Sequence, residues 1–281
     1  PSAHPERWRD RPCETSAAAA RQVPIPAESA QAEVLEDESR DRADLSYPER
    51  FIVSSSNHLT VQGAVMSQKT LTNPSYLQAV RERVMVFDGA MGTSLQKQNL
   101  TAADFGGERT NGCNDYLVLT KSAAVEAVHR SFLEAGADVL ETDTFRANRL
   151  TLNEYGLSSQ TRAINLAAAR LARRLADEFS VATGQTRFVA GSIGPTGKLP
   201  SMSDPELSDI TFDELAEIFR EQASGLLEGG VDLLLIETSQ DILEVKAAVR
   251  GCLLAFADTG ISVPIQTQVT LDTTGRMLLG T

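Results

Sequence analysis

The stretch EGGVDLLLIETSQD, residues 228–241, contains a pattern that occurs twice in the chain. Residues 227–238 read LEGGVDLLLIET, and residues 133–142 read LEAGADVLET. In each copy a glycine precedes an aspartate by two positions, and an apolar run then leads to Glu-Thr. Glycine commonly ends helices, and a short apolar run between polar residues is typical of a buried strand. Each copy therefore predicts a helix end, a tight turn and a strand that finishes in a carboxylate.

The same alternation extends over most of the chain. Strand-like runs are found at 83–89, 137–145, 187–194, 231–239 and 263–271. Helical periodicity lies between them, and its clearest instance has apolar residues spaced 3, 4, 3, 4 from Ile242 to Phe256. In SDITFDEL, either Asp209 or Thr211 is expected to cap a helix whose first turn is acidic.

Alternating strands and helices predict a parallel sheet with right-handed crossovers. A doubly wound sheet and a (β/α)8 barrel both fit this pattern. The barrel is favoured because polar residues end every strand, where barrels build their sites, and because DGAMGTS is not the glycine-rich dinucleotide fingerprint. Five strands are counted, so the expected fold is the N-terminal five β/α units of a TIM-type (β/α)8 barrel.

Composition restricts the class of protein. The chain has 281 residues, with 26 Lys and Arg against 38 Asp and Glu, which gives a net charge of −12. An acidic chain without a basic patch argues against nucleic acid or an anionic membrane as partner, and no apolar stretch approaches the roughly 20 residues of a membrane helix. Cys13, Cys113 and Cys252 are far apart, which is typical of free thiols in a reducing compartment. The expected location is the cytoplasm.

Two regions differ in composition. Residues 1–75 mix Pro, Ser, Ala and both charges without a sustained period, and are expected to be a disordered or non-native leader. Met66 precedes the first clear pattern, so it is a candidate for the true start. Residues 76–281 form the expected partial barrel.

Two glycine-containing loops have a possible chemical role. FDGAMGTSLQ, residues 87–96, places an acid at a strand end and then opens a short helix, whose N–H groups favour an anion. A plain turn between strand and helix explains the same residues. GSIGPTGK, residues 191–198, lacks the glycine and the hydroxyl residue that a phosphate loop requires, and is interpreted as a rim loop.

Glu237 is the most informative single residue. It follows four apolar residues, and an unpaired buried carboxylate is costly, so it must face solvent, a cation or a ligand. Asp88 ends the first strand at the equivalent depth, and the two carboxylates together suit an ammonium group. A salt bridge to a neighbouring strand is the alternative. His129 is expected on an amphipathic helix between surface and core, Cys113 in a loop and Cys252 in the core.

Several segments together resemble one family. They are VFDGAMGTSLQ, NLTAADFGGE, GCNDYLVLT, FLEAGADVLETDTF, FVAGSIGPTGKLP, ITFDELAEIF, EGGVDLLLIETSQD and VPIQTQVTLDTTGRMLLGT. From about residue 77 to residue 281, the chain resembles the N-terminal homocysteine-binding module of cobalamin-dependent methionine synthase, of homocysteine S-methyltransferase type. The resemblance does not include the leader.

The resemblance implies a (β/α)8 barrel that binds homocysteine. In that family a zinc ion held by three cysteines lowers the pKa of the homocysteine thiol, and the thiolate takes a methyl group from methylcobalamin to give methionine. A neighbouring module recharges the cobalamin from methyltetrahydrofolate. The metal is needed because a free thiol, with a pKa of roughly 8.5, is mostly protonated at neutral pH.

The resemblance also implies roles for particular residues. Asp88 and Glu237 match the carboxylates that hold the homocysteine ammonium group. Gly89, Ala90 and the backbone near Thr93 match the loop that lines the amino-acid end of the site. Thr142 resembles a further contact at the end of the second strand.

None of the three cysteines matches a zinc position, so the chain resembles a module truncated before its zinc cysteines. We expect it neither to bind zinc in the family manner nor to catalyse methyl transfer by itself. Three alternatives stay open: a non-catalytic amino-acid-binding remnant that uses Asp88 and Glu237, a free-standing thiol methyltransferase, and an unrelated barrel lyase in which Asp88, Asp143 and Glu237 hold Mg²⁺.

Overall fold

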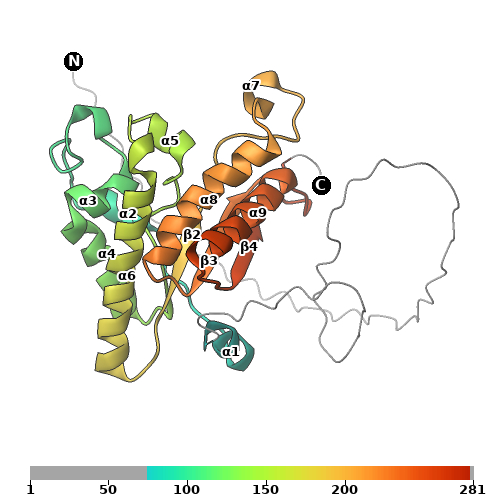
Figure 1. Cartoon of the computed structure of the whole chain (residues 1–281). Helices are drawn as coiled ribbons and strands as arrows, with labels where there is room; N and C mark the ends of the chain where they lie inside the picture. Colours follow the sequence, from blue (N-terminus) through green and yellow to red (C-terminus); the bar gives the residue numbers. More distant parts are fainter. Residues whose placement is uncertain (1–74, 279–281) are drawn as a thin grey trace, which may run out of the picture. The chain divides into compact units, whose positions relative to one another are not determined.

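The computed structural model describes residues 75–278. The expected leader, apart from Ser75, and the candidate start at Met66 lie outside the described residues. The described residues all belong to one unit of the chain, Ala64–Thr281. Within it, helices and strands alternate as the sequence predicts (Figure 1).

Four strands form one parallel sheet in the order β1–β2–β3–β4. They are β1 (Val139–Glu141), β2 (Phe188–Ile193), β3 (Leu233–Ser239) and β4 (Ile265–Val269). Each strand lies inside one of the predicted runs and is shorter than that run. Neighbouring strands pair in chain order, which is the arrangement that successive right-handed crossovers produce.

The first predicted strand, 83–89, is not a full strand. It lies parallel to β1 and meets it at one isolated bridge, between Phe87 and Val139. The Asp88 N–H donates to Val139 O at 2.9 Å, which fixes Asp88 at the edge of the sheet. The prediction of five strands is therefore corrected, for the described residues, to four strands and one bridged segment. The bridged segment is too sparsely paired to count as a strand.

The helices of the described part, except the first, lie between the predicted strand runs, where the sequence predicts helical periodicity. They are α1 (Ser75–Glu82), α2 (Met91–Gln96), α3 (Leu117–Thr120), α4 (Ser122–Ala135), α5 (Arg149–Asn153), α6 (Thr161–Thr183), α7 (Pro205–Ser208), α8 (Phe212–Glu228) and α9 (Ile242–Thr259), with single 3-10 turns η1 (Glu108–Thr110), η2 (Asn114–Tyr116) and η3 (Ser158–Gln160). The pattern from Ile242 to Phe256 lies in α9, and the helix expected after SDI is α8. Between residues 75 and 278, no helix combines the length and apolar character needed to cross a membrane.

Both faces of the sheet are buried. Alternate residues of a strand point to opposite faces. On one face Val189 and Leu234 join a core cluster with residues of α6, α8 and α9. On the other face Phe188 and Leu233 join a cluster that contains Tyr76 of α1, whose ring meets that of Phe188 edge to face at 5.6 Å. Burial on both sides explains why β1, β2 and β3 read as apolar runs. β4 is half-buried to exposed and contains polar residues.

Glycines allow α8 to pack closely against both neighbouring helices. A Cβ atom at Gly251 of α9 would lie 2.5 Å from Ala216 O of α8, and one at Gly225 of α8 would lie 2.9 Å from Arg162 O of α6. Neither position has room for a side chain. Figure 1 shows α8 and α9 side by side across the strands.

Helix caps fix the ends of the elements that border the strand ends. Thr211, one of the two predicted candidates, caps α8 in a capping box with Glu214. Asp241 caps α9 by accepting from the Leu243 N–H, and the same carboxylate accepts from the Ser201 N–H at 2.7 Å. Asp241 therefore holds the loop that follows β2 against the start of α9.

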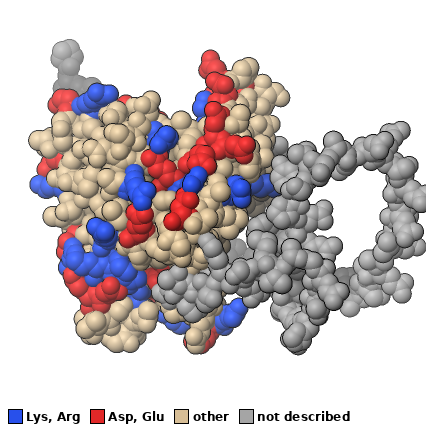
Figure 2. All heavy atoms as spheres, viewed as in Figure 1, with Lys and Arg blue, Asp and Glu red and all other residues tan. Residues whose placement is uncertain are grey.

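Acidic and basic side chains alternate on the outer helices. Arg149 of α5 pairs with Glu221 of α8 at 2.7 Å, and Arg220 of α8 pairs with Asp258 of α9 at 2.5 Å. Figure 2 shows blue and red groups intermixed on this face. These exposed pairs link neighbouring helices, and each contributes little to stability.

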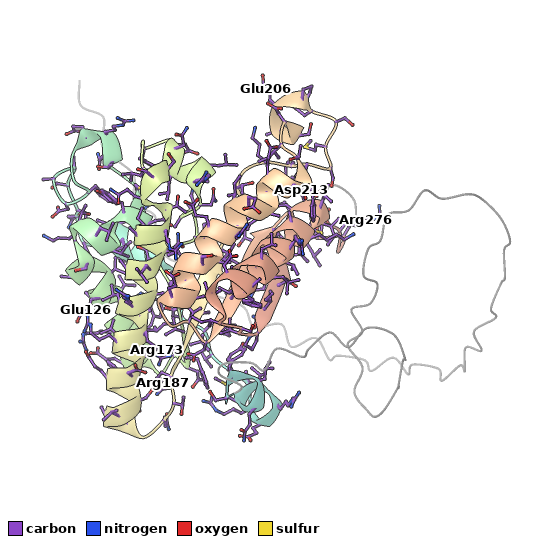
Figure 3. All side chains as sticks on the ribbon, viewed as in Figure 1. Glu126, Arg173, Arg187, Glu206, Asp213 and Arg276 are labelled. Carbon is purple, nitrogen blue, oxygen red and sulfur yellow. The ribbon has the colours of Figure 1, made fainter. Side chains whose placement is uncertain are left out.

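A second set of ion pairs lies at the amino ends of the strands. Asp138, just before β1, accepts two hydrogen bonds from Arg83 at 2.8 and 2.9 Å and one from Arg187 at 3.0 Å. Asp232, just before β3, accepts from Arg173 at 2.7 Å. Figure 3 shows Arg173 and Arg187 near one another in this region. The hydrogen bonds from Arg83 lower the pKa of Asp138, so this carboxylate stays ionised.

Candidate functional site

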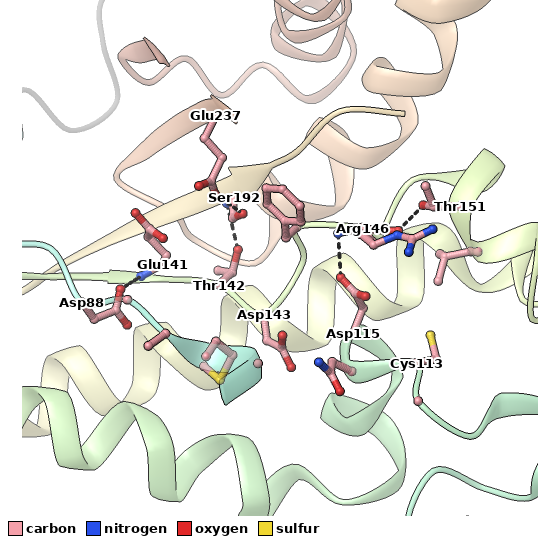
Figure 4. A pocket seen from close by; sticks show the side chains of 18 of the residues that line it. Asp88, Cys113, Asp115, Glu141, Thr142, Asp143, Arg146, Thr151, Ser192 and Glu237 are labelled. Atoms are coloured by element: carbon pink, nitrogen blue, oxygen red, sulfur yellow. Dashed lines mark hydrogen bonds between the residues drawn. The ribbon is translucent and has the colours of Figure 1, made fainter. Parts of the chain in front are cut away.

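A cavity of about 390 Å³ lies at the carboxyl ends of the strands (Figure 4). Its walls come from the loop after Asp88, from the end of β1 and the residues that follow it, from Ser192 of β2 and from Glu237 of β3. Its size is that of a small-molecule site, and parallel α/β proteins bind ligands at this end of the strands. Five of its lining side chains are carboxylic acids: Asp88, Asp115, Glu141, Asp143 and Glu237.

Three of these acids gather at the strand ends. Asp88 Oδ1 accepts from the Glu141 N–H at 2.8 Å, which ties the first segment to β1. Glu237 Oε1 accepts from the Ser192 hydroxyl at 2.5 Å, which ties β3 to β2. The side chain of Glu141 also lines the cavity (Figure 4). We call Asp88, Glu141 and Glu237 the strand-end carboxylates.

Two of the strand-end carboxylates, Glu141 and Glu237, have a raised pKa. Burial raises the pKa of Glu141 to about 8, and the negative charges of Glu237 and Asp88 add to this shift. Burial is also the largest cause of the raised pKa of Glu237, where the Ser192 hydrogen bond acts in the opposite direction and Asp88 raises it further. The group therefore retains a proton near neutral pH unless a cation compensates its charge.

Backbone geometry directs Glu237 into the cavity. The residue after it, Thr238, has a φ of 58°, in the left-handed region that a β-branched residue rarely adopts. The pairing of β3 with β4 shifts register between Ile236 and Ser239. The strand is therefore irregular at Glu237. Such strain persists only where the surrounding structure holds it, and it is often found at functional sites.

The loop after Asp88 forms another wall. Gly89, Ala90, Met91 and Gly92 line the cavity, and α2 then begins at Met91. Ala90 has a φ of 50°, so this loop also contains a left-handed residue. The short helix predicted from FDGAMGTSLQ is thus confirmed.

The structure brings together most of the residues that the sequence and the resemblance singled out. Asp88, Gly89, Ala90, Thr142 and Glu237 all line this cavity. Thr142 lies in its floor, where its hydroxyl oxygen accepts from the Ser192 N–H at 3.0 Å. The exception is Thr93, whose exposed side chain is not part of the lining.

A second pair of acids lies at the other end of the cavity. Asp115 of η2 accepts from the Arg146 N–H at 2.9 Å, and burial raises its pKa to about 6. Asp143 follows β1, and burial together with the charge of Asp115 raises its pKa. The sequence analysis did not propose Asp115 or Arg146 as site residues. Arg146 directly follows the predicted run 137–145. Asp115 comes from a loop outside the strand pattern, and only the folded chain brings it to the cavity.

The described residues do not fit a zinc or magnesium centre. Between residues 75 and 278, no group of three or more His, Cys, Asp or Glu side chains is arranged to hold a metal ion, and this applies to Asp88, Asp143 and Glu237 as well. Cys113 lines the cavity and Cys252 lies in α9, in separate core clusters. Burial raises the pKa of each thiol to about 12, so both are protonated.

His129 lies closer to the site than its sequence position indicated. The side chain is fully buried in α4, and its Nδ1 atom is 3.6 Å from Asp88 Oδ2. The interpretation of His129 as a residue between surface and core is therefore wrong. Helical periodicity places His129 on the inner face of α4, but it does not identify Asp88, which lies in the bridged segment before β1.

Known proteins that resemble this chain share its family. The profile of the family described as homocysteine S-methyltransferase matches residues 85–281. The methionine synthase of Mycobacterium tuberculosis (strain ATCC 25618 / H37Rv) is 41% identical over 214 residues, which are 76% of this chain and 17% of that protein. The methionine synthase of Mycobacterium leprae (strain TN) is 42% identical over 204 residues, 73% of this chain and 16% of that protein. The chain thus spans about a sixth of the length of these relatives.

Solved structures show the same fold. The metallated form of the homocysteine methyltransferase MmuM from Escherichia coli matches with a TM-score of 0.58 and 22% identity, covering 73% of this chain and 70% of that one. Its oxidized form matches with a TM-score of 0.59 and 22% identity, covering 73% and 69%. At this identity the likeness concerns the α/β fold with its parallel sheet.

Proposed function

This chain belongs to the homocysteine S-methyltransferase family, and we propose that it forms the homocysteine-binding part of a methionine synthase. In that reaction the homocysteine thiol receives a methyl group from methylcobalamin, originally from methyltetrahydrofolate, and methionine results. The observation that carries the proposal is the set of strand-end carboxylates around one cavity. Within residues 75–278, no Lys or Arg forms an ion pair with any of them.

The strand-end carboxylates suit the ammonium group of an amino acid. An ammonium ion has three N–H donors and a positive charge, so it can replace the proton that the group otherwise retains. Asp88 and Glu237 are the proposed direct partners. Glu141 interacts with both of them, because its pKa is raised first by burial and then by the negative charges of Glu237 and Asp88.

The remaining proposed contacts surround the same end of the cavity. Gly89 and Ala90 would present backbone groups to the amino-acid end of homocysteine, and Thr142 would contact it from the floor. For Thr93 only the backbone is proposed, because the side chain is exposed. The cavity of about 390 Å³ is larger than homocysteine requires, which leaves space toward Asp115 and Asp143.

Zinc and cobalamin belong to the proposed whole reaction and not to the chemistry of the described residues. Zinc would supply a deprotonated thiol, but Cys113 and Cys252 lie in separate clusters and cannot share one ion. We therefore assign these residues the binding and orientation of homocysteine, and we expect no methyl transfer from them alone. Cobalamin and folate modules are the proposed partners of the reaction.

The proposal includes a fold and a location. Parallel strands in chain order, with a bridged segment before β1, are consistent with the first five β/α units of a (β/α)8 barrel. Cys113 and Cys252 are free thiols, which suits a reducing compartment such as the cytoplasm. Residues 1–75 remain the proposed leader.

One alternative has an observation in its favour. The alternative is a non-catalytic protein that binds an amino acid through the same Asp88 and Glu237. It is favoured by the described residues, which contain no set of groups that could activate a thiol by metal coordination. A free-standing methyltransferase is less favoured, because the identity to methionine synthases, 41%, exceeds the 22% to MmuM.

Calorimetric titration of the full chain with homocysteine tests the proposal. We expect saturable binding to the unaltered chain, and a loss of about tenfold or more in Asp88→Asn and in Glu237→Gln, since each removes a charge-assisted hydrogen bond. Asp213→Asn is the matched control, because Asp213 is an exposed carboxylate of α8. The analogue without the amino group, 4-mercaptobutanoate, should bind weakly to every variant. Absence of binding to the unaltered chain, or equal affinity for both ligands, would contradict the proposal.

A further inference from the structure

His129 is a buried imidazole without a hydrogen-bond partner at ordinary distance. Its side chain is fully buried in α4, and neither ring nitrogen has a hydrogen bond within the described residues. A neutral imidazole has one donor and one acceptor nitrogen, and leaving both unsatisfied in the interior is costly. A partner for His129 must therefore be sought among the polar groups around it.

Asp88 has a carboxylate oxygen close to His129. Its Oδ2 atom is 3.6 Å from His129 Nδ1, and its side chain is 4% exposed. A movement of about half an ångström would bring the two atoms to hydrogen-bond distance. Hydrogen bonds of functional groups are often long in the absence of substrate and shorten when it binds.

The second oxygen of Asp88 is already fixed. Asp88 Oδ1 accepts from the Glu141 N–H of β1 at 2.8 Å. With Nδ1–H of His129 directed to Oδ2, the carboxylate would be held from the sheet on one side and from α4 on the other. Its plane would then be set, and its free lone pairs would face the cavity that it lines.

We propose that His129 is a positioning residue, which donates Nδ1–H to Asp88 Oδ2 and so holds this carboxylate in the orientation that receives the ligand ammonium. This inference rests on the proposed function, because Asp88 is the assigned ammonium partner. His129 itself does not line the cavity, so it acts through Asp88 alone.

Three substitutions of His129 distinguish a role in positioning Asp88 from a role in packing alone. The asparagine amide branches from Cγ as Nδ1 does, so His129→Asn keeps a donor toward Asp88. The glutamine amide lies one atom further out, near the place of Nε2, and His129→Leu removes both donors. We expect His129→Asn to bind homocysteine within about threefold of the unaltered chain, and His129→Gln and His129→Leu to lose about tenfold or more.

A double substitution tests whether His129 acts through Asp88. We expect Asp88→Asn with His129→Leu to bind as weakly as Asp88→Asn alone, because the positioned group is already gone. Losses that multiply would overturn the proposal, as would equal affinity in the Asn, Gln and Leu variants. The melting temperature of each variant, measured in parallel, identifies a loss that comes from unfolding.

Nitrogen NMR tests the same contact without any ligand. The chain has three histidines, His4, His58 and His129, and the His129→Asn spectrum identifies the signal of His129. We expect a protonated Nδ1 whose shift changes in Asp88→Asn and stays the same in Asp213→Asn. An unprotonated Nδ1, or a signal unaffected by Asp88→Asn, would overturn the positioning role even if homocysteine binds. Failure to bind homocysteine, with this NMR result intact, would count against the proposed function only.

Discussion

The two ends of the parallel sheet both carry buried or half-buried acids, but in the described part of the chain only the acids at the amino end form ion pairs with arginines. At the amino ends, Asp138 and Asp232 accept hydrogen bonds from Arg83, Arg187 and Arg173. At the carboxyl ends, Asp88, Glu141 and Glu237 line a cavity, and between residues 75 and 278 no Lys or Arg forms an ion pair with them; His129 Nδ1 lies 3.6 Å from Asp88 Oδ2.

The presence or absence of an arginine partner determines the direction of the pKa shift in each set of carboxylates. A carboxylate with a guanidinium partner has its pKa lowered, as Asp138 has, and its charge is used within the fold. A carboxylate without one has its pKa raised, as Glu141 and Glu237 have, and its charge is available to a ligand. The repeated pattern of the sequence places an acid before β1 and before β3 and a second acid at the end of each run. We therefore propose that a single β/α unit contributes to stability at one end and to binding at the other.

The largest effect is expected from breaking the paired end. Asp138→Asn would leave Arg187, which is 6% exposed, without its carboxylate. Removing one member of a buried pair costs about 3 kcal/mol or more of unfolding free energy. Urea denaturation measures this loss. The homocysteine affinity of the folded fraction should stay unchanged, and a loss of affinity without a loss of stability would remove the distinction between the two ends.

The opposite sign is expected at the unpaired end. Burial raises the pKa of Glu141 from its ordinary value of 4.5 to about 8 in the folded chain. Its contribution to stability is therefore complete below the ordinary pKa and is lost as the pH rises to 8. Glu141→Gln cannot ionise and should stabilise the chain, relative to the unaltered protein, by on the order of 2 kcal/mol at about pH 9 and little at about pH 5. Urea midpoints at the two pH values measure the effect. Destabilisation at both would show that Glu141 has a structural partner.

A smaller effect is expected from the hydroxyl that supports Glu237. The Ser192 hydroxyl lowers the pKa of Glu237 through its hydrogen bond. In Ser192→Ala that pKa should rise, and homocysteine should bind about fivefold more weakly, which corresponds to a lost hydrogen bond of about 1 kcal/mol. Titration calorimetry measures the change, with exposed Ser159→Ala as control. An unchanged affinity would mean that Glu237 is oriented by its backbone alone.

The smallest effect is expected from an exposed pair, which belongs to neither end. Arg149 is 54% exposed where it meets Glu221. Arg149→Ala should change the unfolding free energy by less than about 0.5 kcal/mol, with no change in homocysteine affinity. A loss of unfolding free energy as large as that of Asp138→Asn would show that burial does not decide how much an ion pair of this protein contributes to stability.

The sequence predicts the order of the elements better than the contacts between them. Strands β1 to β4 lie within the predicted runs, and β1 to β3 read as apolar runs because they are buried on both faces. The segment at 83–89 reads the same way, yet it forms one bridge, because pairing depends on a neighbour that local pattern does not describe.

In the candidate site, too, the sequence predicts the position of some residues but not the contacts between distant segments. Glu237 could be placed at a strand end from its preceding apolar run, and Asp88 from its equivalent depth. The contact between His129 and Asp88 depends on how α4 packs against the sheet, and Asp115 reaches the cavity from a loop outside the strand pattern. Neither the register shift after Ile236 nor the left-handed Thr238 has a signal in the sequence.

The most direct test of the account is to count the protons released when homocysteine binds. Titrations of the full chain at about pH 7, in two buffers with different ionisation enthalpies, give this number. The strand-end carboxylates retain a proton that an ammonium group would displace, so we predict release of about half a proton or more per homocysteine bound, and clearly less in Glu141→Gln. Binding with no proton release, or equal release in both proteins, would contradict the assignment of these carboxylates as the cation site.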